Sequence, residues 1–96
     1  DLERALAAVL RSETAHFTLV WDNASRAQRL ILQALAAEPG RPFTASYRRR
    51  HQLPGTSGVQ RGLEPLLAGE LVRKLQDGSY DVMEPFLREW IRSYVT

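Results

Sequence analysis

A run of three arginines is the most concentrated chemical feature of this 96-residue sequence. Arg48, Arg49 and Arg50 are consecutive, and with Arg41 they give residues 41–51 a local charge of +4, because this stretch contains no acid. Guanidinium groups pair with phosphates and carboxylates through parallel hydrogen bonds. The run is therefore interpreted first as a solvated basic face, and contact with phosphates or with an acidic partner surface is the functional alternative.

The segment that follows carries amide and guanidinium side chains that could read the edges of bases. Gln60 and Arg61 have the groups that pair with adenine and guanine, whereas Glu64 on the same exposed side would repel phosphates. The candidate contact residues for nucleic acid or a partner protein are all polar and are expected to be exposed: Arg48, Arg49, Arg50, Thr56, Ser57, Gln60, Arg61, Arg73 and Lys74.

No spacing in the sequence is typical of catalysis or of metal binding. His16 and His51 are far apart, and no paired carboxylates accompany either of them. Gly55, Gly58 and Gly62 lack the following lysine of a phosphate-binding loop. We therefore expect no catalytic residue, no cofactor and no metal site, and the chain itself is not expected to be an enzyme.

Composition indicates the expected cellular setting of the chain. It contains no cysteine, which excludes disulfides and makes a reducing cytoplasm the expected setting. No run approaches the roughly 18 apolar residues that a membrane span needs, so we expect no membrane contact. The sequence starts at Asp1 in a helical pattern without an initiator Met, which favours a fragment of a longer protein.

Two helices are predicted between residues 25 and 51. Ser25 and Gln28 form an S-x-x-Q capping box, and apolar residues recur at helical spacing after it. This pattern predicts a helix over residues 25–37, ended by a Pro-Gly pair, as the first helix of a helix-turn-helix unit. A short second helix is predicted over residues 45–51.

A third helix is predicted after Pro54. Ser57 and Gln60 form a second S-x-x-Q pattern, which we expect to cap it. Pro65 removes one intrahelical hydrogen bond, at a cost of about 3 kcal/mol, so a kink or an early end near Glu64 is expected.

After the third helix, the repeat of apolar residues changes from the 3.6-residue period of a helix to the 2-residue period of a strand. Residues 70–76 and 80–83 alternate in the manner of strands, and Asp77-Gly78 lies between them. An Asp-Gly pair is typical of a two-residue type I′ turn. The pattern therefore predicts an antiparallel hairpin.

Helices are also predicted at both ends of the chain. Residues 1–22 form either one helix or two, with apolar positions that include Leu6, Val9 and Leu10, and Glu84-Pro85 opens the last helix. Both ends carry apolar stripes that a three-helix core cannot bury. We therefore expect them to pack together, within one chain or between two chains in a homodimer, through the aromatic residues Phe17, Trp21, Trp90 and Tyr94.

Together these elements predict a mostly α-helical fold with a minor β component. The fold is a winged helix-turn-helix: a three-helix core with a β-hairpin wing, plus an N-terminal and a C-terminal helix. We divide the chain into an N-terminal helical extension that links to an upstream domain (residues 1–22), the core (23–83) and the C-terminal helix (84–96). The predicted shared core comprises Leu30, Ile31, Leu35, Val59, Leu63, Leu67, Leu71 and Val82.

The order of these motifs resembles a known family. The stretch from Trp21 to Ala36, the Leu53-Pro54 turn with the segment from Ser57 to Leu66, and the ending from Tyr80 to Ile91 carry the likeness. They resemble the C-terminal winged-helix domain of prokaryotic AAA-type (STAND, archaeal-ATPase-like) NTPases, whereas Gly62 and Pro65 depart from that pattern. The resemblance implies a domain that follows a nucleotide-binding core, and DNA binding is a property of some members.

Charge favours one of the two functions that this fold suggests. Residues 56–83, which hold the expected recognition helix and wing, have three basic and four acidic side chains, a local charge of −1. A DNA reader normally concentrates positive charge there. We therefore expect a regulatory module that docks on the upstream ATPase domain or on a partner protein. The alternative is weak binding of double-stranded DNA through the third helix and the wing.

Overall fold

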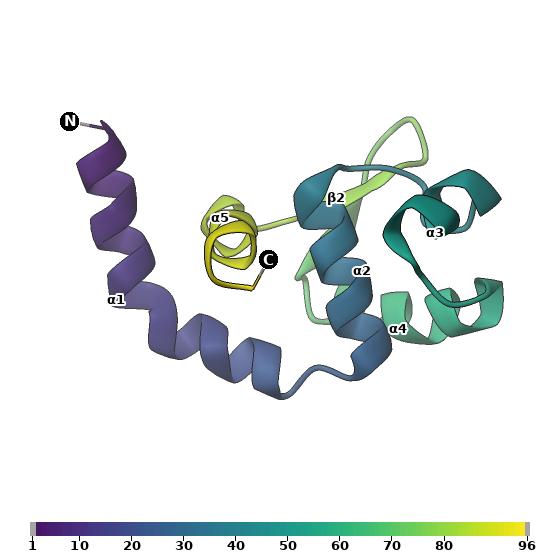
Figure 1. The fold of residues 1–96 in the computed structure, drawn as a ribbon, viewed down its shortest axis with the longest axis horizontal. Coiled ribbons are helices and arrows are strands. Elements are labelled where there is room, and N and C mark those ends of the chain that lie inside the picture. Colours follow the sequence, from purple (N-terminus) through teal and green to yellow (C-terminus); the bar gives the residue numbers. More distant parts are fainter. Residues whose placement is uncertain (1, 96) are drawn as a thin grey trace.

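Three helices and a two-stranded antiparallel hairpin form the centre of the computed structural model (Figure 1). It describes residues 2–95, except for the side chains of residues 6, 7 and 9–12. The elements in chain order are α1 (Leu2–Asp22), α2 (Arg26–Ala37), α3 (Ala45–His51), α4 (Thr56–Ala68), β1 (Val72–Lys74), β2 (Tyr80–Val82) and α5 (Pro85–Tyr94). This is the predicted winged-helix architecture.

Helix α2 starts as the sequence predicts. The backbone N–H of Gln28 donates to Ser25 Oγ at 3.2 Å, and the backbone N–H of Ser25 donates to Gln28 Oε1 at 2.6 Å. The tight turn of the helix-turn-helix joins α3 to α4, so these two helices form the helix-turn-helix pair. Helix α2 is the first of the three core helices and lies outside that pair. This corrects its assignment to the helix-turn-helix unit.

Helix α4 differs from its prediction at both ends. Gly55 is the N-cap and no side chain caps the helix, so the expected box between Ser57 and Gln60 is wrong. Ser57 is already the second helical residue, too far along to act as the cap. The helix also continues through Pro65 to Ala68 and does not end near Glu64. Burial of Leu63 and Leu66 on either side of the proline offsets the lost hydrogen bond.

The hairpin pairs in the predicted region but turns through a different loop. Val72 lies opposite Val82 and Lys74 opposite Tyr80. The N–H of Gly78 donates to the carbonyl of Leu75 at 3.0 Å, and of the turn residues only Gly78 has positive φ, at 89°. This is a three-residue loop ending in a left-handed glycine, so the predicted type I′ turn is wrong.

Most of the predicted core is buried, with one correction. Ile31, Leu35, Val59, Leu63 and Val82 are buried, and Leu67 and Leu71 pack against them half-buried. Leu30 is half-buried and lines a surface cavity instead. It lies toward the gap between α2 and the turn before α4, where the small residues of α4 leave space.

The two terminal helices pack together within one chain. Helix α1 is a single helix, which settles the choice between one helix and two, and α5 lies against its second half (Figure 1). The ring centroids of Phe17 and Trp21 lie 5.9 and 6.4 Å from that of Trp90, and Tyr94 stacks beside Trp90 at 6.1 Å. The predicted aromatic contact is therefore confirmed. The apolar positions expected at residues 6, 9 and 10 lie outside the described side chains.

Within the described part of the chain, no helix has the length and apolar character needed to cross a membrane.

Candidate interaction surface

The three consecutive arginines of α3 have different environments. The Arg50 guanidinium lies 3.2 Å from Glu38 Oε1 and over the ring of Tyr47, at 5.6 Å from its centroid. Arg48 is half-buried, and its buried Nε has no partner among the described residues. Arg49 is exposed and forms no ion pair with a described residue. Of the predicted run, Arg49 is therefore the most available to a partner.

Glu38 anchors α3 to the end of α2. The ring nitrogen Nε2 of His51 donates to Glu38 Oε1 at 2.7 Å, and the Tyr47 hydroxyl donates to the Glu38 carbonyl at 2.8 Å. The hydrogen bond from His51, together with the charge of Arg50, holds the pKa of the Glu38 carboxyl below its ordinary value. Burial raises the pKa of Tyr47 well above its ordinary value. His51 therefore has a structural role.

The exposed face of α4 is close to neutral. Thr56 and Ser57 are exposed, and Gln60 Nε2 donates to Glu64 Oε1 at 3.1 Å. This bond occupies the amide that would read a base and places a carboxylate beside it. Arg61 is exposed and forms no ion pair with a described residue.

The wing adds two exposed cations and a hydrogen-bonded tip. Arg73 and Lys74 are exposed on β1. Asp77 Oδ1 accepts from the backbone N–H of Ser79 at 2.9 Å and from its hydroxyl at 2.6 Å, and these bonds lower the pKa of Asp77. Arg41 donates to the Asp77 carbonyl and so links the tip to the segment before α3.

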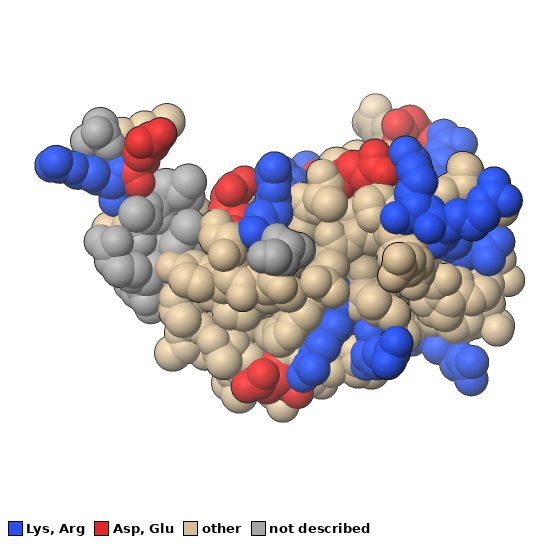
Figure 2. Space-filling view, in the orientation of Figure 1, with Lys and Arg blue, Asp and Glu red and all other residues tan. Residues whose placement is uncertain are grey.

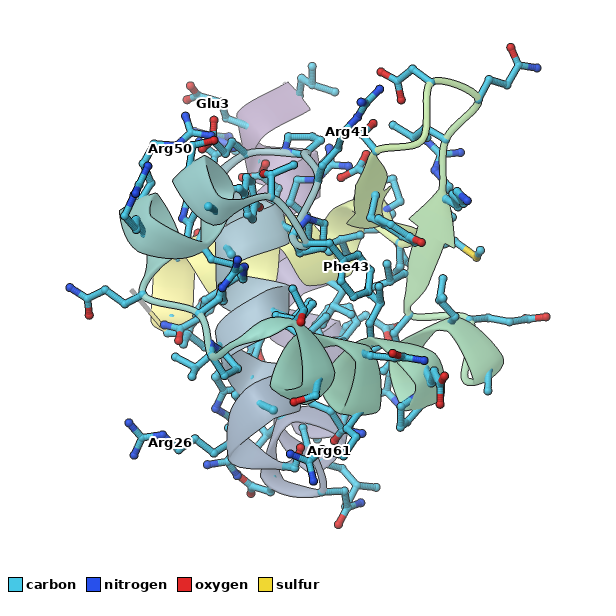
Figure 3. All side chains as sticks on the ribbon, turned by 90° about the vertical axis from the view of Figure 1, so that its right-hand side faces the viewer. Glu3, Arg26, Arg41, Phe43, Arg50 and Arg61 are labelled. Carbon is cyan, nitrogen blue, oxygen red and sulfur yellow. The ribbon has the colours of Figure 1, made fainter. Side chains whose placement is uncertain are left out.

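The elements that carry the predicted contact residues, α3, α4 and the wing, lie on one side of the molecule (Figure 3). Basic side chains gather at the end that carries α3 and again along the lower edge, with acidic side chains nearby (Figure 2). Viewed from that end, α3, α4 and the wing face the reader, and Arg50 and Arg61 lie at opposite ends of this face (Figure 3).

Phe43, which the sequence analysis overlooked, lies near the middle of this face (Figure 3). Its side chain is 37% exposed, and its ring makes an edge-to-face contact with Tyr80 at a centroid distance of 6.5 Å. A large aromatic residue in a short Pro-containing loop was the signal that could have identified it. We name the surface formed by α3, α4, the wing and Phe43 the recognition face.

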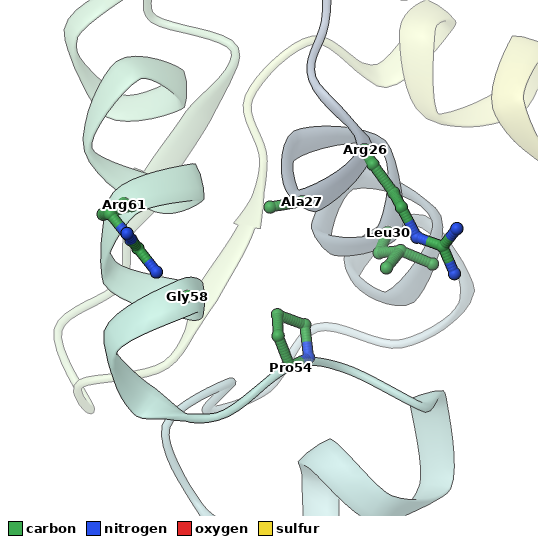
Figure 4. A pocket seen from close by; sticks show the side chains of 6 residues that line it. All are labelled: Arg26, Ala27, Leu30, Pro54, Gly58 and Arg61. Atoms are coloured by element: carbon green, nitrogen blue, oxygen red, sulfur yellow. The ribbon is translucent and has the colours of Figure 1, made fainter.

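A surface cavity of about 340 Å³ opens beside the recognition face, between α2 and α4 (Figure 4). Sequence reasoning identified only Arg61 among its lining residues as a contact residue and placed Leu30 in the core. The signal was Gly58, which has no side chain to fill the space beside Pro54. The lining residues are Arg26, Ala27, Leu30, Pro54, Gly58 and Arg61.

Among the described residues, no three His, Asp or Glu side chains stand close enough together to hold a metal ion.

Comparison with known families finds a match over residues 15–93 to the family described as a probable winged helix domain. Comparisons with curated proteins and with solved structures found no match.

Proposed function

The chain belongs to the probable winged helix domain family, and we propose that it is a non-catalytic, regulatory module that docks on protein. The observation that carries the proposal is the composition of the recognition face. Phe43 lies near its middle, and the Gln60–Glu64 pair occupies α4. Exposed aromatic residues at the centre of a surface are typical anchors of protein interfaces, whereas duplex DNA selects for positive charge there.

We further propose that the module belongs to a larger cytoplasmic ATPase of the AAA/STAND type. This rests on the resemblance of the motifs from Trp21 to Ile91 to the winged-helix domain of those proteins. The partner is then the upstream ATPase domain of the same chain or a separate protein. Reading the complete gene tests this: a G-x-x-x-x-G-K-[ST] loop upstream supports it, and a longer product without a nucleotide-binding motif overturns it.

A salt titration tests docking against DNA binding. Fluorescence anisotropy would measure binding of the 96-residue chain to a labelled mixed-sequence duplex at low and at physiological salt. A docking module should bind DNA weakly or not at all, with a Kd no tighter than roughly 10⁻⁴–10⁻⁶ M at physiological salt, typical of non-specific association. Nanomolar binding of one defined duplex would overturn the proposal.

DNA binding remains the second candidate because several exposed cations have no acidic partner. Arg49, Arg61, Arg73 and Lys74 are exposed and form no ion pair with described residues. In this alternative α4 enters the major groove with Thr56, Gln60 and Arg61 nearest the bases. Reversing Arg49 and Lys74 to Glu should then abolish binding and flatten its dependence on salt. The same variant should leave protein docking through Phe43 in place.

A further inference from the structure

The cavity between α2 and α4 combines an apolar floor with a basic rim. Ala27, Leu30 and Pro54 provide most of the floor, and its volume of about 340 Å³ lies at the small end of the range for ligand sites. Gly58 keeps the entrance open: a Cβ atom there would lie 2.9 Å from Cβ of Pro54. The cavity therefore has room for an apolar side chain of a partner.

Two arginines flank this floor from different helices. Arg26 extends from the first turn of α2, and Arg61 extends from α4 on the opposite side of the cavity (Figure 4). Both are exposed, and neither side chain forms a hydrogen bond or an ion pair with any described residue. The rim thus presents two guanidinium groups with free donors on either side of an apolar surface.

This arrangement selects for an occupant that is both apolar and acidic. A purely charged group would leave Leu30 and Pro54 in contact with water, whereas a purely apolar group would leave the guanidinium groups unused. A sugar–phosphate backbone supplies charge but no apolar side chain for the floor. A peptide segment with carboxylates beside a large apolar residue satisfies both parts, because guanidinium pairs with carboxylate through two parallel bonds.

We propose that the cavity binds a partner-protein segment in which a Leu or Phe side chain enters between Arg26 and Arg61 and neighbouring carboxylates pair with them. The proposal rests on the docking function proposed above and names the class of partner. It adds a second contact region, whose Arg26 and Arg61 are seen from the same end of the molecule as Phe43 (Figure 3).

Nuclear magnetic resonance with synthetic probes tests the proposal. The ¹⁵N-labelled 96-residue chain would be titrated with a peptide that alternates Asp and Glu with Leu and Phe. Backbone amides of Ala27, Leu30, Gly58 and Arg61 should shift. A peptide with Ser in place of Leu and Phe, and one with Lys in place of the acids, should bind at least about tenfold more weakly.

Matched charge reversals separate the cavity from general electrostatics. Arg26→Glu with Arg61→Glu should weaken binding of the acidic peptide about tenfold, because two favourable pairs become repulsive. Arg73→Glu with Lys74→Glu makes the same change of net charge on the wing and should alter the affinity less than twofold. All four positions are exposed, so the spectra of both variants should remain those of a folded chain.

Three results would overturn the cavity proposal: no binding of the acidic peptide, equal loss in the two variants, or shifts centred on Phe43 instead of the cavity. The third leaves protein docking intact. A duplex bound specifically in the same assay would instead overturn the docking function itself, so the two failures can be distinguished.

Discussion

Glu70 has a backbone conformation that glycine would adopt at lower cost. Its φ is 61°, directly after the C-cap Gly69 of α4. The N–H of Glu70 donates to the carbonyl of Leu67 at 3.1 Å, and the N–H of Leu71 donates to that of Leu66 at 2.9 Å. These are the two bonds of a Schellman motif, in which the left-handed position is usually glycine.

We therefore predict that Glu70→Gly raises the free energy of unfolding by about 1 kcal/mol, since left-handed backbone strain is relieved. Urea denaturation would measure it. Glu70→Ala keeps the strain and serves as the control, with an expected change within about 0.5 kcal/mol. Destabilisation by glycine would show that the Glu70 side chain stabilises the fold.

Glu38 makes stability depend on pH in the acid range. Because its pKa is held below the ordinary value of 4.5 by His51 and Arg50, its stabilising contribution is present above 4.5 and is lost as pH falls through the folded-state pKa. The difference in unfolding free energy between the wild-type chain and Glu38→Gln should therefore shrink toward acid pH in a series of urea titrations. A constant difference from neutral to strongly acid pH would contradict this origin.

A capping pattern in the sequence forms a helix cap only where the preceding backbone lets the helix start at that position. Ser25 and Gln28 form the predicted box, but the identical pattern at Ser57 and Gln60 does not. At the second site Gly55 is extended after Pro54 and the helix starts at Thr56. The position of a helix start depends on the turn that precedes it as well as on the capping residues.

At the scale of elements, the approach of α4 to α2 depends on glycine. A Cβ atom at Gly62 would lie 2.8 Å from Cδ1 of Ile31 and 3.1 Å from Cβ of Ala27. The sequence analysis noted Gly62 only as a departure from the family pattern, because its packing partner is not visible in the local sequence. The glycine allows close contact of the two helices.

We predict that Gly62→Ala destabilises the chain by about 1–3 kcal/mol through overpacking, despite the gain of about 1 kcal/mol in helix propensity. Thermal unfolding followed by circular dichroism would measure the change. The double variant with Ala27→Gly should recover part of the loss, because the contact between the two Cβ atoms is removed. A stabilised single variant would show that the helices can move apart freely.

Element types were predictable and the shape of the surface was not. The change of period identified α4 and the hairpin, and the Asp-Gly pair identified the turn region. The loop type depended on which residue takes positive φ, and that is Gly78 alone among the turn residues. The cavity depends on side chains from two helices that meet only in the folded chain, so no local pattern predicted it.

At the scale of the whole molecule, the contact of α1 with α5 completes the core. Phe17 is 3% exposed and packs against Trp90, whereas Leu19 on the same helix is 60% exposed. We predict that Phe17→Ala lowers the free energy of unfolding by about 3–5 kcal/mol and makes tryptophan fluorescence easier to quench with iodide. Leu19→Ala should change stability by less than about 0.5 kcal/mol. Equal effects of the two substitutions would show that α1 does not dock as described.

Charge over the whole molecule is a property in which a docking module and a DNA reader are expected to differ. The net charge is +2. Arg50 and Arg61 lie at opposite ends of the recognition face with Phe43 near its middle (Figure 3), and Glu64 accepts a hydrogen bond from Gln60. We therefore predict weak attraction to any polyanion without a sequence preference, because Gln60 is already bonded to Glu64.

Selection from a pool of randomised duplexes tests the central claim most directly. The 96-residue chain would be used at physiological salt, and recovered duplexes would be sequenced and their affinities measured. The account predicts no enriched sequence, with recovered and random duplexes bound equally weakly. A consensus bound at least about 10³-fold more tightly than random duplex, and lost on replacing Gln60 and Arg61 with Ala, would contradict it.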